Sequence, residues 1–332
     1  MGSPAERGGS TAAGGRADVG RPSDRGQWRS SRGATTSIDG RGNACGGADW
    51  RSHPRVRRFG GRRSVSIRIA FSTLGCPDWT VEQACQAARR HGYDGITLRL
   101  LDGEIVPATL NRDGRERVRA ALGDLSLASI DTSCTFTSPD DAVRARMRAD
   151  AVRYLEMAAD LTAPLIRVFG GRLAEGDNEA AARDRIVDSL NLLSPRAETL
   201  GIGIALETHD SLSASRAVAD VLARVPSHSV GALWDVHHPI RSGESPSETY
   251  DLIGARTIAT HVKDARRVSD GWQLVLMDEG ELPIAEFIRV LRARGWHGWL
   301  AVEWEKKWHP EIPEPDVAMP WHAERLRRLL AT

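Results

Sequence analysis

Short apolar segments alternate with amphipathic segments along most of the chain. From Ile67 onward, mostly apolar runs typical of buried strands recur between segments with helical periodicity. Eight strands are predicted, at residues 67–72, 95–100, 128–133, 164–169, 202–207, 230–235, 258–263 and 299–303. Eight strand–helix repeats within about 265 residues predict an α/β fold of the (β/α)8 TIM barrel type, which typically has about 250 residues.

The segments between the strands carry recognisable helix signals. A helix is predicted to begin after Thr80, with Gln83 completing a capping box and Gly92 as the stop. Two longer helices are predicted over about residues 140–162 and 178–200. A doubly wound open sheet is the alternative fold, but it usually has a glycine-rich turn after its first strand. Residues 73–77 contain no G-x-G-x-x-G pattern, which favours the barrel.

The first 64 residues differ from the rest in composition. They are rich in Gly, Arg and Ser and show no apolar periodicity, so a disordered tail is predicted at 1–64 and the barrel domain at 65–332. Whether this tail belongs to the mature protein stays open. It contains 13 Arg and 5 acidic residues (+8), and since the whole chain is +1, residues 65–332 carry −7. This acidic body argues against nucleic acid as the main partner.

The remaining composition narrows the protein class. The four cysteines form no C-x-x-C pair and fit reduced thiols, so a cytoplasmic location is expected. The sequence has no run of about 18 apolar residues, the length that a membrane-spanning helix needs. The expected partner is therefore a small molecule, with no membrane contact, and association into a homo-oligomer is left open.

The predicted strands five to eight each end near a residue that can bind a metal ion. In a TIM barrel the carboxyl ends of all strands meet at one face, where active sites form. Any one such residue is readily explained as a solvated or arginine-paired strand end, but four in register favour a shared site. Two Glu, one Asp and one His suit Mn²⁺, Mg²⁺ or Co²⁺, and Zn²⁺ also binds such groups. We call these four residues the quartet: Glu207, Asp235, His261 and Glu303.

The strand ends resemble the motifs of a known family. Residues 67–330 resemble the sugar phosphate isomerase/epimerase superfamily of xylose-isomerase-like barrels, which includes ketose 3-epimerases and inosose dehydratases. The resemblance implies that the quartet binds one divalent metal ion and that His238 and Arg267 bind substrate oxygens. In this family the second strand often ends with a glutamate, where this chain has Thr97 followed by Leu98 and Arg99. The motifs that carry the resemblance are residues 205–209, 234–239, 261–264 and 302–305.

Other polar residues near the strand ends carry weaker signals. His209 shares the side of Glu207 and is a candidate contact for a substrate hydroxyl. Lys263 is a candidate for binding substrate or, equally, for pairing with a neighbouring barrel carboxylate. Glu305 shares the face of Glu303 and is therefore the rival ligand on the eighth strand. Trp304 and Trp308 can stack on a sugar, although packing is the commoner role of tryptophan.

These residues suit proton transfer next to a carbonyl. Such a reaction needs a base for the proton and a cation for the developing enediolate oxygen. Glu207 and Glu303 are the expected catalytic bases, each acting on one face of the substrate. The predicted function is a divalent-metal-dependent sugar isomerase or epimerase. A lyase resembling inosose dehydratase and a barrel that binds carbohydrate without catalysis are the alternatives. The related barrel of endonuclease IV uses histidines on strands two and three, which this chain lacks there.

Overall fold

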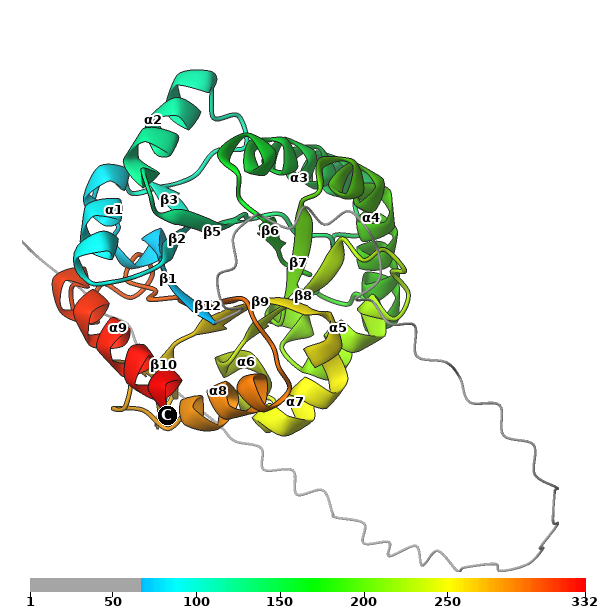
Figure 1. The fold of residues 1–332 in the computed structure, drawn as a ribbon. Coiled ribbons are helices and arrows are strands. Elements are labelled where there is room, and N and C mark those ends of the chain that lie inside the picture. The colour runs from blue at the N-terminus through cyan, green and yellow to red at the C-terminus, as the bar shows by residue number, and fades with distance from the viewer. Residues whose placement is uncertain (1–66) are drawn as a thin grey trace, which may run out of the picture. The chain divides into compact units, whose positions relative to one another are not determined.

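Eight parallel strands close into a barrel, as the sequence predicts. The computed structural model describes residues 67–332. Around the barrel the strands follow the order β1-β12-β9-β8-β7-β6-β5-β2, and helices surround them (Figure 1). The first strand closes the ring between β2 and β12. Residues 1–66, which contain the predicted tail at 1–64, lie outside the described part of the chain.

The element bounds follow the predicted alternation. The barrel strands are β1 (Arg68–Ser72), β2 (Gly95–Leu98), β5 (Ser126–Asp131), β6 (Leu165–Val168), β7 (Gly203–Glu207), β8 (Val230–Asp235), β9 (Thr257–Val262) and β12 (Trp299–Val302). The helices are α1 (Val81–Arg90), α2 (Arg112–Leu122), α3 (Asp141–Leu161), α4 (Glu179–Leu200), α5 (Ser215–Leu222), α6 (His237–Arg241), α7 (Pro246–Ile253), α8 (Ile284–Ala293) and α9 (Pro315–Ala331). No helix within residues 67–332 is long and apolar enough to cross a membrane.

Capping residues explain why the predicted helices begin and end where they do. The Thr80 hydroxyl accepts from the backbone N–H of Gln83, and the Gln83 side chain accepts from the backbone N–H of Thr80, so the predicted capping box is confirmed. Gly92, just past α1, has a φ of 73°, a left-handed conformation that glycine adopts without steric cost. The helices α3 and α4 begin after the side-chain caps Asp140 and Asn178, within a residue of the predicted starts.

The core forms between the sheet and the helices. Outward-facing strand residues such as Ile69, Ile130 and Leu206 belong to one large apolar cluster with the helices. Because side chains alternate along a strand, the intervening positions face the barrel interior. Two small clusters fill these positions, and small alanines dominate them. They are Ala70, Ala128, Trp299 and Ala301, and Leu165, Ala205, Leu233 and Ala259.

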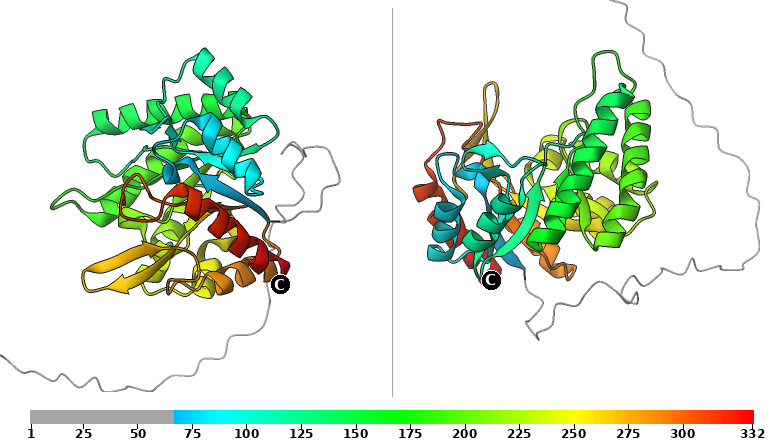
Figure 2. Two further views of the ribbon diagram at one scale, coloured as in Figure 1. Left: turned by 90° about the vertical axis from the view of Figure 1, so that its left-hand side faces the viewer. Right: turned by 90° about the horizontal axis from the view of Figure 1, so that it is seen from above.

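Two predicted strands differ from the structure, and a hairpin lies in a segment without a predicted strand. The third barrel strand was expected at 128–133 but lies at Ser126–Asp131, with a register shift against β2. The second ends at Leu98, because the next residues turn into a small hairpin of β3 (Leu100–Leu101) and β4 (Glu104–Ile105). Between β9 and β12, where no strand is predicted, lies a second hairpin of β10 (Asp264–Val268) and β11 (Gly271–Val275), which projects from the barrel in Figure 2.

Candidate metal centre

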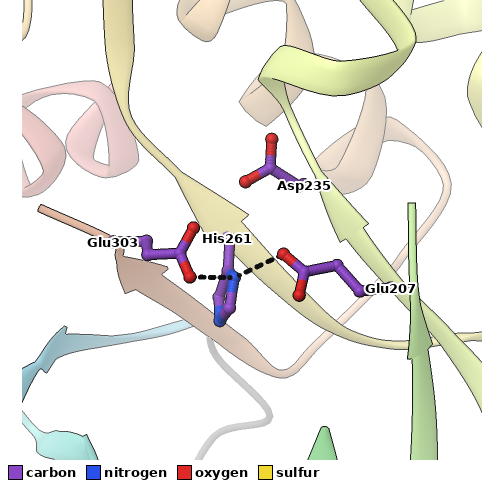
Figure 3. Close-up of side chains that lie close together, drawn as sticks. All are labelled: Glu207, Asp235, His261 and Glu303. Carbon is purple, nitrogen blue, oxygen red and sulfur yellow. Dashed lines mark hydrogen bonds and ion pairs between the residues drawn. The ribbon is translucent and has the colours of Figure 1, made fainter. Parts of the chain in front are cut away.

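The quartet converges at the carboxyl ends of four neighbouring strands. Glu207 ends β7, Asp235 ends β8, His261 lies in β9 and Glu303 follows β12. One ligand atom from each residue lies within 4.8 Å of the others, and all four residues are buried. In Figure 3, Glu207 and Glu303 lie on opposite sides of the His261 ring. The strand pairing produces this arrangement, since Asp235 lies directly opposite His261 in the sheet.

Each carboxylate of the quartet has one oxygen held by a protein partner. Glu207 Oε2 accepts from Arg167 Nη1 at 2.6 Å. Glu303 Oε2 accepts from Lys263 Nζ at 2.6 Å. Asp235 Oδ1 accepts from the backbone N–H groups of His237 and His238, where α6 begins. These contacts orient the carboxylates and leave a second oxygen of each available for a cation.

His261 joins the two glutamates. Its Nδ1 lies 3.0 Å from Glu207 Oε1 and 3.2 Å from Glu303 Oε1. Burial alone would lower the pKa of His261, but Glu303 and Glu207 raise it well above its usual value. Burial would likewise raise the pKa of Glu303, but His261 and Lys263 hold it well below its usual value. Three buried carboxylates around one imidazole therefore form a site with a strong demand for positive charge.

The quartet fits a divalent metal ion in composition and geometry. Its donors are three carboxylates and one imidazole, a set that is common for Mn²⁺, Mg²⁺, Co²⁺ and Zn²⁺. Asp235 Oδ2 is buried and accepts no hydrogen bond within residues 67–332, although Lys263 Nζ lies 3.0 Å away. His261 Nδ1 faces Glu207 Oε1 and Glu303 Oε1, and one ligand atom of Asp235 lies within 4.8 Å of a ligand atom of each of the other three residues.

Lys263 pairs with carboxylates, which is the second of its two predicted roles. Its side chain is 1% exposed, and Nζ lies within 3.0 Å of Asp235, Glu303 and Glu305. Burial would lower the pKa of Lys263, but Asp235 and Glu303 raise it well above its usual value. Glu305, the rival ligand, contacts Lys263 from the rim, and its side chain is 22% exposed. The geometry therefore groups Glu303, rather than Glu305, with the other three.

The predicted substrate-binding histidines line the edge of the quartet. His238 is buried beside Asp235, and neither of its ring nitrogens has a hydrogen-bond partner within residues 67–332. Its ring centroid lies 4.4 Å from that of His209. His209 in turn packs against Phe169 and pairs with Asp210 at 3.2 Å. Unpartnered buried nitrogens such as those of His238 are available to a polar ligand.

The side-chain contacts of Arg267 and Trp304 within residues 67–332 are with residues outside the quartet. Arg267 is exposed on β10, and its guanidinium lies 5.2 Å from the Trp272 ring centroid. Trp272 contacts His237, which stacks on His238, so the hairpin reaches the histidines indirectly. Trp304 is fully buried and donates to Pro313 O at 2.9 Å, which fits packing rather than sugar stacking. Trp308 is exposed.

Three residues near the quartet were not among the predicted site residues. Asp131, at the end of β5, places Oδ2 3.5 Å from His261 Nε2. Arg167, in β6, holds Glu207. Arg99 follows β2 and is buried. Their signal was a charged residue inside or directly after an apolar run, and it extends the strand-end pattern to the other half of the barrel.

Comparisons with known proteins agree with this geometry. The family model described as xylose isomerase-like TIM barrel matches residues 85–329. A fructoselysine 3-epimerase from Escherichia coli O157:H7 is 24% identical over 277 residues, which are 80% of this chain and 98% of the relative.

Solved structures show the same fold. The IOLI protein with a bound zinc atom has a TM-score of 0.69 at 14% identity, covering 80% of this chain and 98% of the other. A probable 3-DHS dehydratase from Bacillus anthracis has a TM-score of 0.65 at 16% identity, covering 79% and 99% of the two chains.

Proposed function

The chain belongs to the xylose isomerase-like TIM barrel family, and we propose on this premise that it is a divalent-metal-dependent sugar isomerase or epimerase. The observation that carries the proposal is the pair of buried glutamates on opposite sides of His261 (Figure 3). The relative named fructoselysine 3-epimerase supports this class of reaction. The substrate class is a small carbohydrate or polyol with a carbonyl group.

The two glutamates are suited to move a proton between the faces of a substrate carbon. Burial would raise the pKa of Glu207, but Arg167 and His261 hold it well below its usual value. Both glutamates are therefore ionised at neutral pH and can act as bases. One carboxylate removes the proton next to the carbonyl, and the other returns a proton to the opposite face, which inverts the carbon. Return of the proton to the neighbouring carbon interconverts aldose and ketose.

The other residues bind and orient the substrate. A divalent ion held by the quartet, with Mn²⁺, Mg²⁺ and Co²⁺ favoured by the donor set, supplies positive charge at the substrate oxygens. His238 offers its free ring nitrogens to a hydroxyl, and His209 lies beside it. Lys263 keeps Glu303 ionised and oriented through its contact at 2.6 Å. Arg267 reaches substrate only where the substrate extends toward the hairpin.

Solvent deuterium exchange tests this proposal. The protein is incubated with Mn²⁺ in D2O with ketoses, aldoses and inososes, and NMR follows deuterium at the carbon next to the carbonyl. Glu207→Gln and Glu303→Gln should each reduce exchange by about 100- to 10,000-fold, since an amide is no base. Glu314→Gln, at an exposed carboxylate that pairs with Lys306, is the matched control and should leave exchange unchanged. Full exchange in both glutamine variants of the quartet would disprove the assigned roles.

A lyase on the same scaffold is the second candidate, because His209 can donate a proton. Burial would lower the pKa of His209, but Asp210 and Glu207 raise it above its usual value. His209 pairs with Asp210 at 3.2 Å and lies beside His238. In its protonated form it can donate a proton to a departing hydroxyl group, as dehydration of a keto-polyol requires. The same experiment separates the candidates, since a lyase releases water and forms an unsaturated product, whereas an epimerase returns a saturated, deuterated sugar.

A further inference from the structure

Arg99 is a buried arginine without a carboxylate partner. The residue is 7% exposed, and its Nη1 donates to Asp131 O at 3.1 Å and to Ser133 Oγ at 2.9 Å. The other two guanidinium nitrogens, Nε and Nη2, make no hydrogen bond within residues 67–332 and remain partly accessible to solvent. A buried guanidinium usually requires a paired charge, because desolvation of an unpaired charge is costly.

A second guanidinium lies close to the first. Arg167 is 2% exposed, its Nη1 donates to Glu207, and its Nε is buried without a partner in the described chain. Burial and the charge of Arg167 together lower the pKa of Arg99 to about 10. Arg167 is neutralised by its contact with Glu207 at 2.6 Å, whereas Arg99 has no carboxylate at ion-pair distance within residues 67–332.

The barrel mouth is divided between these arginines and the quartet. The strands β2, β5 and β6 are consecutive in the ring (Figure 1). Arg99 follows β2, Asp131 ends β5 and Arg167 lies in β6. The strands β7, β8, β9 and β12 follow β6 around the ring and position the quartet at their carboxyl ends, and β1 closes the ring between β12 and β2. Arg167 connects the two halves, because its guanidinium also holds Glu207. A ligand on the quartet can therefore extend over the arginines.

We propose that the substrate carries an anionic group, a carboxylate or phosphate, and that Arg99 binds this group with support from Arg167. The planar guanidinium fork matches two oxygens of either anion, and charge-assisted hydrogen bonds of this kind are among the strongest in proteins. This inference rests on the proposed function, and it specifies the substrate as an anionic carbonyl sugar or sugar acid.

Calorimetric titration of the Mn²⁺-loaded protein tests the inference with three probes of similar size. The probes are D-fructose, D-fructose 6-phosphate and 5-keto-D-gluconate, which are neutral, a phosphate and a carboxylate. At least one anionic probe should bind more tightly than D-fructose by about 10- to 100-fold. The anion that gains more identifies the natural group as phosphate or carboxylate.

Variants then assign the gain to Arg99. Arg99→Gln should remove most of the difference between the anionic and neutral probes, and Arg99→Lys should keep part of it. Arg89→Gln is the matched control: Arg89 donates to the carbonyls of Ala121 and Leu122 at the end of α2, and its loss changes the net charge equally. Mn²⁺ affinity within twofold of wild type in Arg99→Gln shows an intact quartet.

The outcomes separate this inference from the proposed function. Equal binding of neutral and anionic probes, or unchanged anion binding in Arg99→Gln, would overturn the anion subsite and show that Arg99 only supports β5. If Arg99→Gln loses both Mn²⁺ binding and anion binding, Arg99 has a structural role, and the anion subsite is likewise overturned. Absence of deuterium exchange with every substrate would refute the proposed chemistry, whereas a binding difference that depends on Arg99 would still stand.

Discussion

Replacement of Asp131 by asparagine should weaken metal binding, although Asp131 is not in the quartet. The carboxylate is fully buried, and Ser129 Oγ holds its Oδ1 at 2.6 Å, which directs Oδ2 toward His261 Nε2. A carboxylate there favours the tautomer with the proton on Nε2, which would leave the lone pair on Nδ1 available to a metal ion held by the quartet. An asparagine NH2 group in its place favours the opposite tautomer, whose proton blocks Nδ1.

The structure sets the size of this effect. Changes in such outer partners of metal-bound histidines typically cost about 10- to 100-fold in metal affinity. The separation of 3.5 Å between Nε2 and Oδ2 exceeds the usual range of a hydrogen bond. We therefore expect the lower part of that range, a loss of about 10- to 30-fold, or about 1.4 to 2 kcal/mol.

Calorimetric titration of the metal-free protein with Mn²⁺ measures the effect. Asp251→Asn is the control, because Asp251 is an exposed residue of α7 that pairs with Arg294 and its substitution changes the net charge equally. Zn²⁺ replaces Mn²⁺ for NMR of the His261 ring nitrogens, which reports the tautomer directly. A Mn²⁺ affinity of Asp131→Asn within twofold of wild type would refute the positioning role of Asp131.

Three further predictions concern stability. Lys263→Met should destabilise the metal-free protein by about 3 to 5 kcal/mol, because it leaves Asp235 unpaired. In urea unfolding, Mn²⁺ should restore part of the lost stability. Equal losses of stability with and without Mn²⁺ would contradict this prediction. Burial lowers the pKa of His322 to about 3 in the folded protein, so on acidification the unfolded chain, with the ordinary pKa of 6.5, takes up a proton first. The stability contributed by neutral His322 is therefore complete above pH 6.5 and is lost as the pH decreases toward 3. The wild-type protein should lose about 2 kcal/mol of unfolding free energy between pH 6.5 and 5 through this residue, and His322→Leu should not show this loss. An unchanged pH dependence of urea unfolding in the variant would count against the prediction. Gly280→Ala places a Cβ 2.0 Å from Asp264 Oδ1, which accepts backbone hydrogen bonds from Ala265 and Leu282. The clash should lower the free energy of unfolding by about 2 kcal/mol, and a Tm equal to that of wild type would exclude it.

The fold was predictable because its signals are local. Strand runs, side-chain caps such as Thr80, and stops such as Gly92 each depend on a few adjacent residues. The grouping of the quartet was predictable for a related reason, since barrel closure brings consecutive strand ends to one face.

The partners of the quartet were less predictable. The contact of Arg167 with Glu207 joins residues 40 positions apart, and no local pattern indicates it. The two-residue displacement of β5 hid Asp131, because the predicted strand at 128–133 placed this residue inside the strand instead of at its end. Lys263 had two equally plausible roles, and only the distances to three carboxylates favour one of them.

The position of β12 in the ring has a consequence for folding. This strand inserts between β9 and β1, and its residues 299–302 pair with residues 68–71 from the start of the barrel. Glu303 thus reaches the other ligands only after the two most distant parts of the barrel have met. During synthesis the edges of β1 and β9 stay unpaired until this last strand is available. A metal ion that needs all four ligands cannot bind during the earlier folding steps. It should therefore stabilise only the closed barrel, which slows unfolding and leaves the folding rate unchanged.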